Sequence, residues 1–168
     1  NGQFIGANGT EVKIVYGTAP ATSPPSSFRI RAVDGNYLKI ITKFAEAGQK
    51  VEGLSYLATG HTTDVIAFLE TPADEATLTS VALNVTSKAT KPFVILGGFL
   101  YNWQDQRYDF TGVTFIGPAP TSAAFPVQQM YLSKYIGPGD LFEARVWTCG
   151  LGNTGPHQVW HDFISIQV

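Results

Sequence analysis

Residues 78–86 read LTSVALNVT, and this stretch decides the fold class. Side chains of an extended chain point alternately to opposite sides of the sheet. Val81, Leu83 and Val85 therefore share one face, while the positions between them carry alanine, asparagine and threonine. This alternation with a period of two predicts a β-strand with one face buried.

The same pattern recurs toward the C-terminus, in residues 141–148 (LFEARVWT) and 163–168 (FISIQV). Residues 92–101 (PFVILGGFLY) are apolar on both faces and contain Gly97-Gly98, which indicates a central strand with a β-bulge. Further strands are expected over residues 11–16, 28–33, 37–43, 51–57, 65–70, 108–116 and 128–133, with an Asp34-Gly35-Asn36 hairpin turn between the second and third of these.

No segment carries a sustained helical stripe of apolar residues. We therefore predict an all-β fold, an antiparallel β-sandwich of the jelly-roll type, with no helix longer than about two turns. The side chains expected in its core are Val81, Leu83, Val85, Ile95, Phe142, Val146, Ile164 and Ile166.

The length of 168 residues suits one domain with a core of its own. A Pro/Ser-rich stretch over residues 19–27 suggests a boundary there. We expect either an N-terminal strand and linker over 1–27 followed by a sandwich over 28–168, or one domain over 1–168. Asn1 is not an initiator methionine, so the chain looks processed or cut from a longer one.

Charge and hydropathy exclude two classes of partner. The net charge is −2 and no cluster of lysine or arginine occurs, so nucleic-acid binding is not expected. No apolar run reaches the roughly 18 to 20 residues that a membrane span needs, so no insertion into a membrane is expected.

The C-terminal half reads SKATKPFVILGGF (87–99), LSKYIGPGDLFEARVW (132–147) and DFISIQV (162–168). Over roughly residues 78–168 it resembles the jelly-roll heads at the C-termini of phage tail fibres and related virion proteins, and it is similar to the C1q/TNF-like group. The resemblance implies a trimeric, host-facing module on a virion surface or in the extracellular space. It carries over no catalytic residues.

Candidates for chemistry are few. His157, His161 and Asp162 are close in sequence, but in a strand the two histidines would lie about 13 Å apart. No Gly-x-Ser-x-Gly elbow is present, and Cys149 has no signature around it. We therefore expect no catalytic residues, no metal site and no cofactor, and thus a protein that is not an enzyme.

Residues 101–109 (YNWQDQRYD) combine three aromatic rings with amide, acid and guanidinium groups. Such a mixture suits a sugar, whose C–H face stacks on a ring while its hydroxyls bond to planar polar groups. The predicted ligand-binding residues are Tyr101, Asn102, Trp103, Asp105, Arg107 and Tyr108, with Trp103 as the main platform. The alternative is a hairpin whose aromatic rings cap the core. Trp147 shares its strand face with Glu143 and Arg145, so we expect it on a solvated or subunit-facing surface.

Two functions follow from these features. The first is a non-enzymatic module on the surface of a virion or fibre, which assembles as a homo-oligomer, most simply a trimer, and attaches to a host-cell glycan. The second is a carbohydrate-binding module of a secreted enzyme or adhesin.

Overall fold

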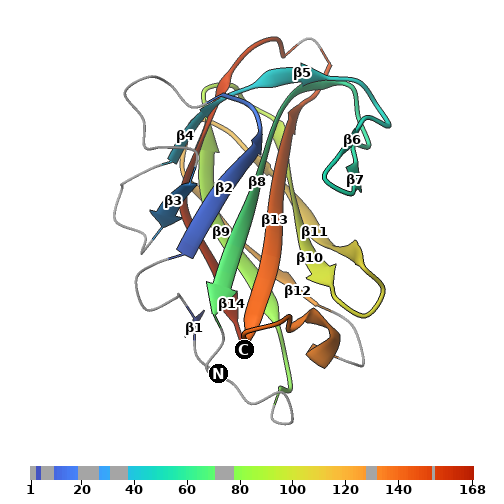
Figure 1. Cartoon of the computed structure of the whole chain (residues 1–168). Coiled ribbons are helices and arrows are strands. Elements are labelled where there is room, and N and C mark those ends of the chain that lie inside the picture. The colour runs from blue at the N-terminus through green and yellow to red at the C-terminus, as the bar shows by residue number, and fades with distance from the viewer. Residues whose placement is uncertain are drawn as a thin grey trace.

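The computed structural model describes residues 3–4, 10–18, 27–30, 38–70, 78–127, 132–152 and 154–168. Within them the chain forms two antiparallel sheets packed face to face (Figure 1). The described residues contain no helix long and apolar enough to cross a bilayer.

The larger sheet has seven strands, in the order β11-β10-β13-β8-β2-β3, with β5 also paired to β8. Their bounds are β2 (Thr10–Tyr16), β3 (Ser27–Ile30), β5 (Lys43–Ala45), β8 (Gly60–Glu70), β10 (Val94–Asn102), β11 (Arg107–Ile116) and β13 (Leu141–Gly150). Both β2 and β3 belong to this sheet, so residues on either side of the Pro/Ser stretch contribute to it. The stretch itself, from 19 to 26, lies outside the described residues, as does the 34–36 turn.

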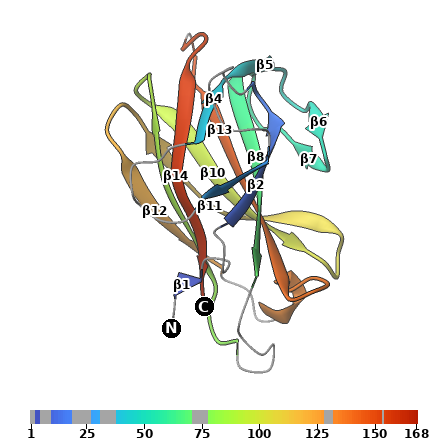
Figure 2. The same cartoon turned by 60° about the vertical axis from the view of Figure 1, so that its left-hand side comes forward.

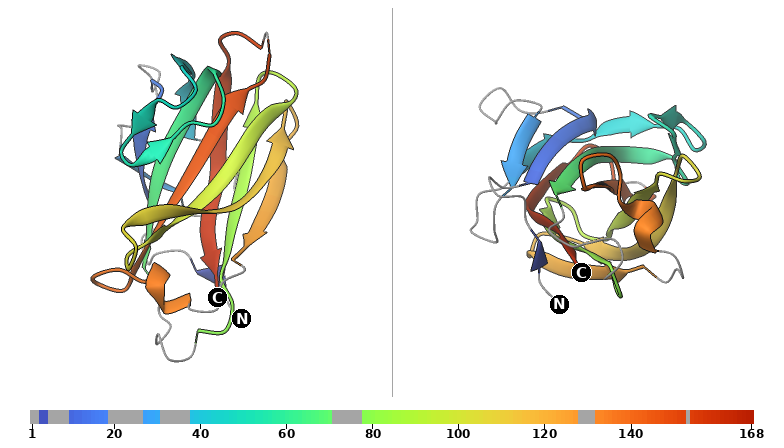
Figure 3. Two further views of the ribbon diagram at one scale, coloured as in Figure 1. Left: turned by 90° about the vertical axis from the view of Figure 1, so that its right-hand side faces the viewer. Right: turned by 60° about the horizontal axis from the view of Figure 1, so that its bottom comes forward.

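The smaller sheet has five strands, in the order β1-β14-β9-β12, with β4 also paired to β14. Their bounds are β1 (Gln3–Phe4), β4 (Leu38–Ile41), β9 (Ala82–Ala89), β12 (Thr121–Pro126) and β14 (Gln158–Gln167). From β8 onward the chain crosses repeatedly between the sheets, and the two views in Figure 3 show the resulting sandwich from its edge and from one end. The predicted antiparallel β-sandwich of the jelly-roll type is confirmed.

The elements outside these two sheets are short. A hairpin of β6 (Lys50–Val51) and β7 (Leu54–Ser55) stands apart. The helical content of the described residues is a single 3-10 turn, η2 (Leu132–Tyr135). Figure 2 shows the β6–β7 hairpin and the turn between β10 and β11 projecting on the same side of the molecule.

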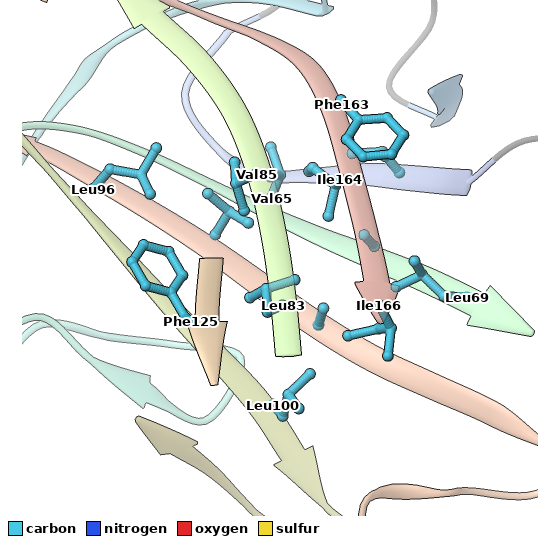
Figure 4. Close-up of a cluster of buried hydrophobic side chains, with 14 of the residues drawn as sticks. Val65, Leu69, Leu83, Val85, Leu96, Leu100, Phe125, Phe163, Ile164 and Ile166 are labelled. Carbon is cyan, nitrogen blue, oxygen red and sulfur yellow. The ribbon is translucent and has the colours of Figure 1, made fainter. Parts of the chain in front are cut away.

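The core between the sheets is built from the inward faces that the alternation predicts. Figure 4 shows Leu83, Val85, Ile164 and Ile166 of the smaller sheet among side chains of the larger one. Seven of the eight predicted core residues are buried. Ile95 is the exception, because β10 turns it to the outer face of the larger sheet, where it packs beside a second apolar cluster.

A bulge lies opposite the predicted glycine pair, since the register between β10 and β11 shifts between Gly98 and Phe99. The extra residue is Thr111 of β11, however, and β10 itself pairs with β13 in unbroken register. Gly98 pairs with Gly112, and a Cβ on either would lie 2.5–2.6 Å from the ring of Phe125. The two glycines are therefore needed to let a ring of the facing sheet approach the strand backbones.

Three strand predictions are corrected. Strand β12 was not expected, because its sequence TSAAFP is rich in alanine and ends in proline. The segment 128–133 was expected as a strand, but Leu132 and Ser133 begin the 3-10 turn, and residues 128–131 lie outside the described part. Strand β14 begins at Gln158, five residues earlier than the alternation at 163–168 indicated.

Candidate binding surface

The outer face of the seven-stranded sheet is divided into a covered half and an open half. Residues 46–59, here called the cover hairpin, lie over the part of this face formed by β8 and β13. Between the hairpin and the sheet lies an apolar cluster separate from the main core. The hairpin contributes Leu54 and Tyr56, and the sheet side contributes Tyr16, Ala45, Phe99, Trp147 and Cys149. Trp147 was expected at a solvated or subunit-facing surface. It does lie on the outer face, but it is buried and its ring stacks on Tyr56.

Arg145 holds the cover hairpin to the sheet and is fully buried. Its Nε and Nη2 donate to the two carboxylate oxygens of Asp64, at 2.8 and 2.6 Å. Its Nη1 and Nη2 also donate to the carbonyls of Glu52 and Val51 in the hairpin, at 2.9 and 2.7 Å. Tyr56 completes the network by donating its hydroxyl to Asp64 at 2.8 Å.

The open half of the outer face belongs to β10 and β11. Phe110, Val113 and Phe115, here called the β11 strip, are 57%, 56% and 56% exposed. They lie on one side of the strand because the bulge removes Thr111 from the alternation: Phe110 pairs with Phe99, while Val113 pairs with Gly97. A row of exposed large apolar side chains on one strand marks a contact surface rather than scattered exposure.

Two tyrosines extend the β11 strip toward the turn. The rings of Tyr101 and Tyr108 meet edge to face at 5.1 Å, and Tyr108 lies under the guanidinium of Arg145 at 4.9 Å. The hydroxyl of Tyr108 donates to Glu143. Burial, together with this bond, raises the pKa of Tyr108 above its usual value, so the phenol keeps its proton. The result is an aromatic surface bordered by fixed polar groups.

The predicted site residues differ in how far their side chains are exposed to solvent. Tyr101 and Tyr108 are half-buried on the outer face, and Asp105 and Arg107 are exposed at the turn. Asn102, the third residue of the predicted site to lie near the turn, is fully buried. Its amide donates to Asp105 and Asp109 at 2.9 and 3.0 Å and accepts from the Asp105 backbone at 2.9 Å, so it closes the turn.

Trp103 does not stand off the sheet as predicted. It is half-buried, its backbone N–H donates to the carbonyl of Lys134 at 2.9 Å, and its ring meets Tyr101 edge to face. A Cβ on Gly137 would lie 2.1 Å from the indole, so the ring packs directly on that backbone. Trp103 thus docks the turn onto the segment that follows η2.

His157 and His161 are buried, and each ring is hydrogen-bonded within the fold. His161 is fully buried in β14, with Nδ1 2.7 Å from the hydroxyl of Ser87. His157 is also buried, with Nδ1 3.0 Å from the carbonyl of Gly155. No group of three or more metal-ligating side chains occurs among the residues that the structure describes.

Sequence reasoning missed the β11 strip itself. Phe110, Val113 and Phe115 do not alternate strictly in the sequence, because the residue displaced by the bulge interrupts the period. Gly97 and Gly98 in β10 indicated a bulge at this point. Allowing for one extra residue in β11, which pairs with β10, would have placed Phe110, Val113 and Phe115 on the same face.

No family model matches the chain, and no curated protein does. Among solved structures, the chain is similar to one described as CBM4, with 13% identity, a TM-score of 0.46, and coverage of 95% of this chain and 94% of that one. It is similar to a family 29 carbohydrate-binding module, with 9% identity, a TM-score of 0.36, and coverage of 94% and 88%. A mutant of CBM29-2 complexed with mannohexaose gives 8% identity and a TM-score of 0.36, with 94% and 91% covered.

These neighbours do not support the phage-fibre or C1q/TNF part of the resemblance. At such identities and TM-scores the likeness does not bear on the function of this chain, which has to be argued from its surface.

Proposed function

We propose that this chain is a non-catalytic β-sandwich module that binds a glycan across the β11 strip, with Tyr101 and Tyr108 extending the contact. The observation that carries the proposal is the row of exposed Phe110, Val113 and Phe115 beside those two half-buried rings. Each large apolar side chain left in water forgoes about 1.5–3 kcal/mol of burial free energy. Three such exposed side chains in a row on one strand therefore favour a surface that binds a partner.

The chemistry of the surface suits a sugar chain. Aromatic faces stack on the C–H faces of pyranose rings, and an elongated row can contact successive rings of one chain. Hydroxyl groups need planar donors and acceptors at the border. Arg107 supplies a guanidinium, held by Asp109 at 3.1 Å, and Asp105 lies beside it at 3.7 Å. A module of this kind would serve a secreted enzyme or adhesin by holding it on a polysaccharide outside the cell.

The test is glycan binding by two single variants, Phe110→Ala and Phe115→Ala. Each should lower affinity by about 2 kcal/mol, or roughly 30-fold, because each removes a stacking face. The melting temperature should stay unchanged, because both side chains are mostly in water. A glycan array first finds the ligand, and titration calorimetry then measures each variant. Leu57→Ala is the matched control, since Leu57 is 77% exposed on the cover hairpin.

If both phenylalanine variants bind the glycan with full affinity, the β11 strip is not the binding face. If no glycan on the array is bound, the proposed function is wrong.

A second candidate is the virion- or fibre-surface module that assembles as a trimer and attaches to a cell-surface glycan. The same exposed β11 strip favours it, because apolar residues that a lone chain leaves in water can be covered by neighbouring subunits. Sedimentation at about 0.1 mM separates the two candidates. A trimer that Phe110→Ala and Phe115→Ala dissociate supports assembly, and a monomer that binds glycan supports the first proposal.

A further inference from the structure

Phe93 gains little free energy of burial at its position in the folded chain. It precedes β10, is 73% exposed, and has a backbone φ of +57°. The left-handed region is unfavourable for a bulky residue, because Cβ crowds the carbonyl oxygen that follows. The exposed ring gains little from burial to offset that strain. Strain of this kind, unsupported by packing, is found where a residue serves binding or catalysis.

The surroundings of Phe93 form a shallow depression at one end of the sandwich. Its volume is about 350 Å³, and it is lined by Lys91, Pro92, Phe93, Leu151 and Thr154. We call it the terminal depression. Leu151 is 42% exposed, so a second apolar side chain lies open beside the ring.

The backbone beneath the depression is firmly held. Val94, which follows Phe93, pairs with Gly150 of β13 and with Ile116 of β11. On the other side, the N–H of Thr90 donates to the carbonyl of Gln158 at 2.9 Å, and its hydroxyl accepts from the Gln158 N–H at 3.0 Å. The ring is thus presented from a rigid base, which lowers the entropy cost of binding.

The charge of the depression is positive. Lys91 is exposed and forms no ion pair in the described part of the chain. None of the five lining residues carries a carboxylate. The charge on Lys91 also reaches His157, whose pKa is lowered mainly by burial and, to a smaller extent, by His61 and Lys91. A ligand that brought a carboxylate here would meet a cation that has no ion pair within the described ranges.

We propose that the terminal depression binds an acidic sugar ring, a uronate, which stacks on Phe93 and places its carboxylate at Lys91. An aromatic ring beside one unpaired ammonium matches the two chemical features of such a residue, an apolar C–H face and a negative charge. The depression adjoins the Phe115 end of β11, because Ile116 pairs with Val94. The inference therefore rests on the proposed glycan-binding function and adds the class of sugar.

The experiment uses the whole chain and a panel of uronate polymers: polygalacturonate, alginate and hyaluronate. Each polymer is paired with its carboxyl-reduced form, which keeps the sugar backbone but not the charge. The native chain should bind at least one acidic polymer about tenfold more tightly than its reduced form, and this preference should shrink with added salt. Lys91→Gln should abolish the preference and leave binding to the reduced polymer unchanged.

Phe93→Gly tests the ring and the strain together. Glycine relieves the left-handed backbone, so the melting temperature should stay the same or rise, while affinity for the acidic polymer should fall about tenfold or more. Lys50→Gln is the matched control for loss of an exposed lysine on the cover hairpin, and Leu57→Ala controls for loss of an exposed apolar side chain.

Several outcomes would overturn the proposal. Equal binding of acidic and reduced forms by the native chain would exclude a uronate site, even if the β11 strip binds neutral glycans. A lower melting temperature in Phe93→Gly would make the ring structural, and conversion of an oligomer to a monomer would make it a subunit contact. Undiminished neutral binding in Phe110→Ala, with the acidic preference retained, would instead count against the β11 strip alone.

Discussion

At the scale of single residues, a polar side chain sits within the apolar interior. His161 lies on β14 and is fully buried. Its ring Nδ1 is hydrogen-bonded to the hydroxyl of Ser87. Burial disfavours the imidazolium, and it lowers the pKa of His161 to about 4. The neutral ring is therefore part of the folded state.

This burial predicts a loss of stability in mild acid. The unfolded chain takes up the histidine proton near pH 6.5, whereas the folded chain does so only near pH 4. The free energy of unfolding should be full above about pH 6.5, fall between 6.5 and 4, and lose about 3 kcal/mol in all from this group. His157, whose pKa is also lowered by burial, adds a loss of the same sign.

Urea melts at several pH values measure the loss, with His161→Asn as the comparison. Its free energy of unfolding should depend less on pH over the same interval, because an amide does not titrate. Parallel pH profiles for the two proteins would show that His161 does not control acid stability.

At the scale of elements, the cover hairpin depends on one side chain of the sheet beneath it. Strands β6 and β7 have two residues each, too few to be stable alone. The hairpin's exposed ion pair, Lys13 to Glu52 at 3.0 Å, adds little in solvent. Arg145 reaches two hairpin carbonyls and Asp64 at once, so it joins the hairpin to the sheet.

Removing Arg145 should therefore be costly. Arg145→Met leaves the Asp64 carboxylate buried without its cation, and a loss of about 3–5 kcal/mol in the free energy of unfolding is expected. The double variant Arg145→Met/Asp64→Leu should recover part of that loss, because the unpaired charge is gone. Denaturant melts of both variants, with Lys13→Met as a control expected to cost under about 1 kcal/mol, would reveal the pattern. A single variant as stable as the native chain would contradict it.

At the scale of the whole molecule, the larger sheet has apolar side chains on both faces. Its inner face contributes to the main core between the sheets, and its outer face carries the smaller cluster under the cover hairpin. Neighbouring residues of one strand therefore belong to different apolar clusters, on opposite faces of the sheet. Leu96 is buried in the main core, whereas Ile95 is partly buried beside the outer cluster.

These neighbours on β10 predict a difference in stability. Leu96→Ala should cost about 2–5 kcal/mol, because it leaves a cavity between the two sheets. Ile95→Ala should cost clearly less, since its site is open on one side. Urea melts of the pair compare substitutions one residue apart in the same strand, and equal losses would mean that the outer cluster is packed as tightly as the core.

Most strands, and the inward faces of β9, β13 and β14, could be predicted from the sequence, although β12 and the outward face of Ile95 could not. Alternation at Val81–Val85 or Ile164–Ile166 follows from backbone geometry within a few residues, so it can be read locally. The same is true of the bulge, which two adjacent glycines signalled. Turn chemistry near Asn102 was visible too, and Asn102 closes the turn through its bonds to Asp105.

Tertiary structure alone decided which parts of the outer face stay open. Arg145 bonds to carbonyls more than ninety positions earlier in the chain, and Trp147 is buried only because that distant hairpin lies over it. Trp103 packs on Gly137, which lies 34 positions later in the chain. The β11 strip is exposed because no segment in the described part of the chain covers it. Strand periodicity is a property of neighbouring residues, whereas the covering of a sheet's second face depends on where remote segments pack. That is why the fold could be predicted from the sequence and the proposed binding surface could not.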